Sequence, residues 1–224
     1  MNNYGKAVRR AILSLVVFLL LLATVMFVPA GIGWWQGWLF LAVFTLQIVL
    51  TALYIWRTNP EIFVARSKIQ QGTKDWDWVI FSLLQILIAG IFPVAGLDHG
   101  AAAPVWVIAV GYVLLTAGMA GTAWVLKVNN FAEMSVRIQT ERGHQVVDTG
   151  HYAFVRHPFY VATFPLFAGM PLALGSYWAL IPVAVIGIAL VVRTALEDRM
   201  LQEELVGYKE YASRVRYRLV PGVW

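Results

Sequence analysis

The sequence predicts an all-α integral membrane protein of about six membrane helices, with five also possible. Its 224 residues are 60 % hydrophobic and 13 % charged, and the mean hydropathy is +0.69. Four segments contain no charged residue: 11–56, 78–97, 100–126 and 158–192. A helix that crosses a bilayer needs about 20 mainly apolar residues, so each of these segments is long enough to cross.

The first apolar segment is predicted to cross the membrane twice. It contains the sequence "VPAGIGWW" (Val28 to Trp35), in which a Pro/Gly turn is followed by tryptophans typical of the membrane interface. Basic residues precede this segment, but its apolar run is longer than that of a signal peptide, so we expect a retained first helix. Segments 78–97 and 100–126 are each predicted to form one crossing.

Segment 158–192 is predicted to form a short hairpin of the last two membrane helices. One straight helix would be roughly 52 Å long, which exceeds a bilayer core of roughly 30 Å. Pro165, Pro171 and "LGSYW" (Leu174 to Trp178) offer places for a turn. A single long tilted helix, giving five crossings, is the alternative, but it would leave the two basic flanks on opposite sides.

All 17 lysines and arginines lie in four polar segments: 1–10, 57–77, 127–157 and 193–224. The positive-inside rule therefore places these segments, and both termini, in the cytoplasm. The net charge of +5 indicates this orientation and contact with anionic lipid, not nucleic-acid binding. We expect a single membrane domain over 1–224, with N-terminal helices in 1–100 and the functional region in 101–224.

The sequence "GHYAFVRHPFY" at 150–160 places a cation and an imidazole where an apolar helix begins. Pro158 suits the first turn of that helix and disfavours helical conformation at His157. A helix N-terminus beside Arg156 favours anions, and a guanidinium can bind a carboxylate through two hydrogen bonds. The alternative is that Arg156 contacts lipid headgroups and that His157 only fills space at the interface.

Two further segments carry polar residues at the same membrane face. Segment Glu197 to Trp224 is predicted to start as a helix, through about Leu205, with Glu197 and Asp198 level with Arg156. Segment Lys127 to Tyr152 is predicted to be a polar connection, with alternation typical of extended structure around "SVRIQ". Solvated surface and a plain connecting loop are the simpler interpretations of these two segments.

Several common sites have no counterpart in the sequence. The four histidines lack the spacing of a zinc-binding helix and there are no cysteines, so no metal site is predicted. Neither a dinucleotide-binding glycine motif nor a phosphate-binding loop occurs, and there is no Gly-x-Ser-x-Gly motif. Any cofactor must therefore be held by another kind of site.

The polar segments resemble the isoprenylcysteine carboxyl methyltransferase family of membrane enzymes. "GHYAFVRHPFY" resembles its Gly-x-Tyr-x-x-x-Arg-His-Pro-x-Tyr signature, "EDRMLQEELVGYKEYASRV" its second block, and "NNFAEMSVRIQ" the loop before the first block. The resemblance covers roughly 110–224, whereas 1–100 match only as apolar spans. It implies a cytoplasmic pocket for S-adenosylmethionine at the membrane face, built by Gly150, Tyr152, Arg156, His157, Pro158, Tyr160, Glu197 and Asp198.

The resemblance also implies methyl transfer to a lipophilic acceptor that enters from the bilayer, most like the carboxylate of an isoprenylated cysteine. Asp198 stands where the family usually has Glu. The family's prenylcysteine enzymes carry an arginine in the preceding helix, where this chain has "GMAGTAW" (Gly118 to Trp124) without a basic residue. Arg137 is therefore expected to bind the acceptor carboxylate, and Arg137, Arg156 and Glu197 are the expected catalytic residues.

Three other functions fit parts of the sequence. A phospholipid N-methyltransferase would share the cofactor, and an acid such as Glu133 or Glu197 would then lie near the amine. An NADPH-dependent sterol or enone reductase would need further basic residues for the cofactor's phosphates. A transporter would place ionisable groups near the middle of the bilayer, and the four uncharged segments disfavour an ion-coupled one.

Overall fold

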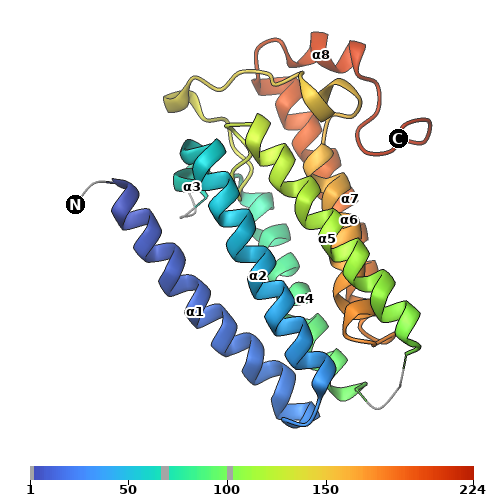
Figure 1. Ribbon diagram of the computed structural model, residues 1–224. Coiled ribbons are helices and arrows are strands. Elements are labelled where there is room, and N and C mark those ends of the chain that lie inside the picture. The colour runs from blue at the N-terminus through green and yellow to red at the C-terminus, as the bar shows by residue number, and fades with distance from the viewer. Residues whose placement is uncertain (1–2, 67–70, 100–102) are drawn as a thin grey trace.

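A computed structural model describes residues 3–66, 71–99 and 103–224, and the described chain is helical throughout its regular structure (Figure 1). The all-α prediction is confirmed. Within these ranges the chain forms eight α-helices: α1 (Asn3–Ala30), α2 (Trp35–Thr58), α3 (Pro60–Ala65), α4 (Asp75–Leu97), α5 (Val105–Val128), α6 (Pro158–Ala173), α7 (Leu180–Glu204) and α8 (Tyr208–Arg214). Two short 3₁₀ turns, Thr140–Arg142 and Gly150–Ala153, lie in the connection between α5 and α6.

Five of the described helices, α1, α2, α4, α5 and α7, are long and apolar enough to cross a membrane. Their outer faces expose large side chains such as Leu20, Ile86 and Ile188, at 65 %, 69 % and 67 % of their surface. Exposed apolar surface on this scale indicates contact with lipid and not with water. The chain is a multi-pass integral membrane protein.

Helix α6, the first of the two helices predicted for segment 158–192, is apolar but short. Its 16 residues span about 24 Å, less than a bilayer core of about 30 Å, and it contains both Pro165 and Pro171. A turn at 174–179, with Gly175 at φ +74°, separates it from α7. The 25-residue α7 is longer than the short helix that was expected, because it continues beyond the apolar segment to Glu204.

The polar parts of the chain gather at one end of the helix bundle. Figure 1 shows the start of α1, the short helix α3, the connection between α5 and α6, and α8 at this end, while the last residues of α1, α4 and α6 lie at the other. The extended structure expected around "SVRIQ" does not form a strand. Its backbone pairs with other groups instead: the N–H of Val136 donates to Asp77 at 2.7 Å, and its carbonyl accepts from the N–H of Lys74 at 3.1 Å.

Helices α5 and α6 pack with their backbones in contact because glycines face each other. A Cβ atom added to Gly118 would lie 2.4 Å from the backbone nitrogen of Leu166, and one added to Gly169 would lie 2.4 Å from that of Leu115. At Gly111 the added atom would be 2.2 Å from the backbone nitrogen of Ala173. Small residues permit this close approach between membrane helices. The "GMAGTAW" stretch, which begins at Gly118, therefore holds α6 against α5.

A buried ion pair holds α4 and α7 together at the polar end. Asp77, in the first turn of α4, is completely buried and accepts from Nε and Nη2 of Arg193 at 2.7 and 3.0 Å. Arg193 also donates to the carbonyl of Met134 at 3.0 Å. Because Asp77 also binds the backbone at Val136, this pair fixes the connection after α5 to both helices.

We expect Gly118→Ala to lower the melting temperature of the protein in detergent. The added methyl group would overlap the backbone of α6, and overpacking of this kind costs typically about 1–3 kcal/mol. Gly90→Ala in α4 is the matched control, since no atom lies within 4 Å of the Cβ that it would add. Equal melting temperatures for the two variants would show that α5 and α6 are not packed this closely.

Candidate functional site

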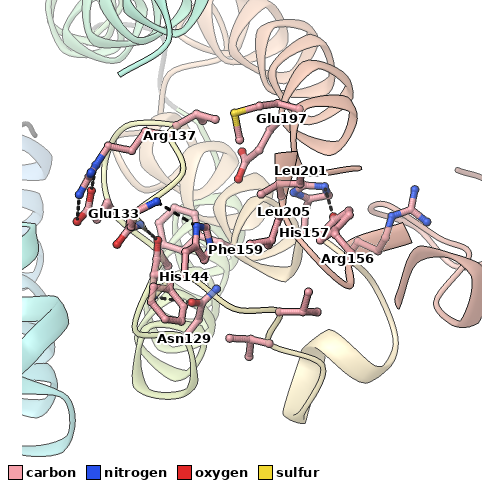
Figure 2. A pocket seen from close by; sticks show the side chains of 18 of the residues that line it. Asn129, Glu133, Arg137, His144, Arg156, His157, Phe159, Glu197, Leu201 and Leu205 are labelled. Carbon is pink, nitrogen blue, oxygen red and sulfur yellow. Dashed lines mark hydrogen bonds and ion pairs between the residues drawn. The ribbon is translucent and has the colours of Figure 1, made fainter. Parts of the chain in front are cut away.

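A polar cavity lies at the end of the bundle where the charged segments meet. Its walls come from three parts of the chain: the connection after α5, the start of α6, and the last turns of α7 with α8 (Figure 2). The predicted residues Arg137, Tyr152, Arg156, His157, Tyr160 and Glu197 all line it. Sequence segments separated by some sixty residues are thus brought to one place.

Asp198 is the central acid beneath this cavity, and it is completely buried. Its carboxylate accepts from Nε and Nη2 of Arg156 at 2.7 and 3.0 Å and from Nε of Arg218 at 2.8 Å. His157 Nε2 lies 3.2 Å away, and the hydroxyl of Tyr208 donates at 3.0 Å. A buried charge is tolerated where it is paired and hydrogen-bonded, as it is here.

Most N–H groups of the Arg156 guanidinium donate hydrogen bonds to other groups of the protein. Besides its two bonds to Asp198, its Nη1 donates to the carbonyls of Val215 and Arg216, both at 2.8 Å. A guanidinium has five N–H donors, so these bonds leave one. Burial would lower the pKa of Arg156, but the hydrogen bonds and charge of Asp198 outweigh it and raise the pKa. Arg156 therefore anchors the C-terminal segment, and its contact with a cofactor stays a prediction.

Glu197 projects from α7 into the cavity and has one hydrogen-bond donor among the described residues, the hydroxyl of Tyr160 at 2.5 Å (Figure 2). Its carboxylate therefore retains acceptor capacity toward the cavity. Across the cavity, Asn129 Nδ2 donates to the hydroxyl of Tyr152 at 2.6 Å. Burial raises the pKa of Tyr152, so this phenol stays protonated at neutral pH.

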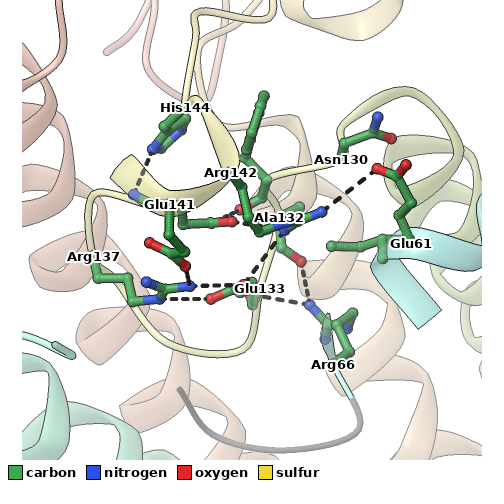
Figure 3. Close-up of polar contacts among 12 residues, drawn as sticks. Glu61, Arg66, Asn130, Ala132, Glu133, Arg137, Glu141, Arg142 and His144 are labelled. Carbon is green, nitrogen blue, oxygen red and sulfur yellow. Dashed lines mark hydrogen bonds and ion pairs between the residues drawn. The ribbon is translucent and has the colours of Figure 1, made fainter. Parts of the chain in front are cut away.

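Arg137 belongs to a separate cluster of charges in the connection (Figure 3). Its Nε and Nη2 donate to Glu133 at 2.9 and 3.1 Å, and Nη2 also donates to Glu141 at 2.6 Å. These hydrogen bonds to Glu133 and Glu141 raise the pKa of Arg137. Figure 2 shows its guanidinium directed toward Glu133 and away from Glu197. The charge that was expected to bind the acceptor is already neutralised.

The remaining predicted site residues support the cavity without lining it. Gly150, at φ +62°, allows the turn before Tyr152, and Pro158 begins α6. Asp198 does not line the cavity but binds Arg156 and Tyr208, which do. The predicted residues are therefore connected, and the side chains of Glu197 and Tyr160 line the cavity.

A second, apolar cavity of about 720 Å³ lies among the membrane helices. Side chains of α1, α2, α4, α5, α6 and α7 line it, including Ile48, Phe81 and Leu84. Four residues line both cavities: Glu133, Phe159, Tyr160 and Arg193. The two cavities therefore meet at a wall formed by the start of α6 and its neighbours.

Several residues in or near the two cavities were not recognised from the sequence. Arg193 and Asp77 stand at the ends of uncharged segments, which marks where helices end but not which charges pair. Asn59 caps α3, and its Nδ2 donates to the carbonyl of Leu126 at 2.8 Å, which ties α3 to α5. Arg66 lines the apolar cavity. The basic segment 57–77 was interpreted only as an indicator of orientation.

Comparison with protein families matches residues 105–203 to the model of the Isoprenylcysteine carboxyl methyltransferase (ICMT) family. The matched region begins at α5 and ends near the end of α7, so it contains the first polar block, α6 and the Glu197–Asp198 pair. No individual curated protein matches the chain. The resemblance seen in the sequence is confirmed at the level of the family.

We expect Asp198→Asn to destabilise the protein strongly. Removing the charge leaves Arg156 buried without an ionic partner, and breaking a buried pair in this way costs about 3–5 kcal/mol. Thermal unfolding in detergent measures the loss. Arg199→Gln is the control, because the Arg199–Glu203 pair is exposed and such pairs contribute little. Similar melting temperatures of the two variants would show that the charge of Asp198 does not stabilise the fold.

Proposed function

Because residues 105–203 match the model of the isoprenylcysteine carboxyl methyltransferase family, we propose that this protein transfers a methyl group from S-adenosylmethionine to a lipophilic acceptor. The match implies a methyltransferase. The acceptor most consistent with the family is the C-terminal carboxylate of an isoprenylated cysteine.

The meeting of the two cavities is the observation that carries this proposal. A polar cofactor and an apolar acceptor need compartments of opposite character that share one boundary. Here the polar cavity and the apolar cavity share Phe159 and Tyr160, which follow the Arg-His-Pro sequence on α6. An acceptor whose chain lies among the membrane helices would thus present its head at the wall of the polar cavity.

The residues of the polar cavity fit the chemistry of S-adenosylmethionine. Glu197 has acceptor capacity for an ammonium group or ribose hydroxyls, and the rings of Tyr152, Tyr160 and Tyr208 offer faces to adenine or to a sulfonium cation. Arg156 has one donor left for a carboxylate. When bound, the cofactor would supply a methyl group activated by its sulfonium, which would pass to the acceptor oxygen while the electron pair of the broken carbon–sulfur bond stays on sulfur.

The residues of the chain itself would orient the two reactants and exclude water from them. A carboxylate acceptor carries no proton to remove, so no general base is needed, and orientation with exclusion of water can supply most of the catalysis. Phe159, Leu201 and Leu205 place apolar surface beside Glu197 in the polar cavity (Figure 2). Tyr160 holds the Glu197 carboxylate in a fixed direction through its hydrogen bond.

The cytoplasm is the proposed location of the polar cavity and of both termini. All 17 basic residues lie in the four polar segments, and the parts of these segments that Figure 1 shows lie at the same end of the bundle as the cavity. Cytoplasmic loops of membrane proteins are enriched in lysine and arginine. The cofactor would then enter from the cytoplasm.

We expect Glu197→Gln to weaken the binding of S-adenosylhomocysteine by roughly ten- to a hundredfold. The substitution keeps the shape of the side chain but removes its charge, and a hydrogen bond to a charged group is worth about 1.5–3 kcal/mol. Calorimetry in detergent measures the affinity. Glu203→Gln, on the same helix but with its acid paired to Arg199 outside the cavity, should bind as the unaltered protein does.

The same preparation tests the reaction class. The unaltered protein should bind S-adenosylhomocysteine but not NADPH, and labelled S-adenosylmethionine should transfer its methyl group to N-acetyl-S-farnesylcysteine. Binding of NADPH instead would favour a reductase. Transfer of label only to an aminophospholipid would assign the protein to N-methylation.

We expect the two ends of the bundle to label from opposite sides of the membrane. The chain has no cysteine, so Ser213→Cys in α8 and Tyr177→Cys in the turn after α6 each provide a single thiol at an exposed position. In oriented vesicles, an impermeant maleimide should reach position 213 from the cytoplasmic face and position 177 from the other. Labelling of both positions from one face would contradict this topology.

A further inference from the structure

Arg66 is a half-buried arginine at the top of the apolar cavity. It follows α3 as its C-terminal capping residue, and its Nη1 donates to the carbonyls of Ala132 and Glu133 at 2.8 and 3.1 Å (Figure 3). The carbon at the centre of its guanidinium lies 5.2 Å from the centre of the Phe159 ring. Arg66 therefore stands beside the wall that the two cavities share.

Arg66 differs from the other enclosed arginines of the two cavities in its partners. Arg137 is paired with Glu133, Arg156 with Asp198, and Arg193 with Asp77. Within residues 3–66, 71–99 and 103–224, no carboxylate lies within ion-pair distance of Arg66, whose hydrogen bonds go to neutral carbonyls. Glu133 itself is close, but its carboxylate is bound by Arg137 and Arg142.

The positive charge of Arg66 is consequently destabilised by its surroundings. Burial, followed by the positive charge of Arg193, lowers the pKa of Arg66 to about 10. The group is still protonated at neutral pH. A partly buried cation with no carboxylate partner is stabilised by an anion that reaches it, because an opposite charge at close range favours the charged form.

We infer that Arg66 binds the anionic head of the lipophilic acceptor while the apolar chain of the acceptor lies among the membrane helices. The cavity below Arg66 is lined by Ile48, Phe81, Leu84 and Phe167, and its volume of about 720 Å³ is in the range of ligand sites. An anion held here lies next to Phe159 and Tyr160, and so next to the polar cavity. This inference rests on the proposed function and gives Arg66 the role that was expected of Arg137.

The experiment compares two ligands that differ only in charge. N-acetyl-S-farnesylcysteine and its carboxamide are titrated into the protein in nanodiscs of zwitterionic lipid, with S-adenosylhomocysteine present. The unaltered protein should bind the acid more tightly than the amide by about tenfold to a hundredfold, the range for a charge-assisted hydrogen bond. Arg66→Gln should remove this preference and leave the affinity for the amide unchanged.

Two controls separate recognition from folding. Arg57→Gln removes an exposed arginine of the same basic segment that lines neither cavity, and it should retain the preference for the acid. The affinity for S-adenosylhomocysteine should be the same in Arg57→Gln, Arg66→Gln and the unaltered protein. A structural role for Arg66 would weaken the binding of acid and amide alike, which overturns the inference.

Three other binding results would also contradict the role of Arg66. Equal binding of acid and amide by the unaltered protein, or a preference that survives Arg66→Gln, overturns the inference. So does a preference lost in Arg137→Gln but kept in Arg66→Gln. The proposed function is judged separately by transfer of labelled methyl groups: an acid bound through Arg66 that takes no label supports the binding site and contradicts the reaction.

Discussion

The negative charge of Asp198 is the constraint on which the polar end of the molecule depends. A carboxylate with no exposed surface has to be surrounded by donors, and the donors here come from the first polar block, from α8 and from the segment after it. Arg156 extends the same network to the carbonyls of Val215 and Arg216. One acid thereby determines where the C-terminal segment lies, next to α8, whose Tyr208 and Tyr211 line the cavity.

The distribution of charge explains why the cavity lies at the membrane face. The apolar segments can be buried in lipid only because they contain no charged residues, so ionisable groups are concentrated where the helices end. At these ends buried charges meet in pairs, Arg193 with Asp77 and Arg156 with Asp198. Such pairs define positions more than they add stability, because desolvation offsets much of the attraction. Glu197 is left to face the cavity.

The helices, and the segments that meet at the candidate site, could be predicted from the sequence. The ion-pair partners of the charged residues there could not. Uncharged runs and Pro/Gly turns act locally, so α4, α5 and the end of α7 were anticipated closely. Arg156 and Asp198 were expected to be level, yet their direct pairing, and the capture of Arg137 by Glu133 and Glu141, depend on how distant segments pack. Arg66 was overlooked for the same reason: its isolation from carboxylates is a property of the fold.

The helices that line the apolar cavity are not packed equally, because α5 and α6 are joined by several close glycine contacts. These two helices lie backbone to backbone and cannot separate without losing the whole of that contact. The cavity is also lined by α1, of which 11 % of the apolar window is buried against 33 % for α5. The walls of the apolar cavity are therefore packed unequally: glycine contacts join α5 to α6, whereas α1 leaves most of its apolar surface to the lipid.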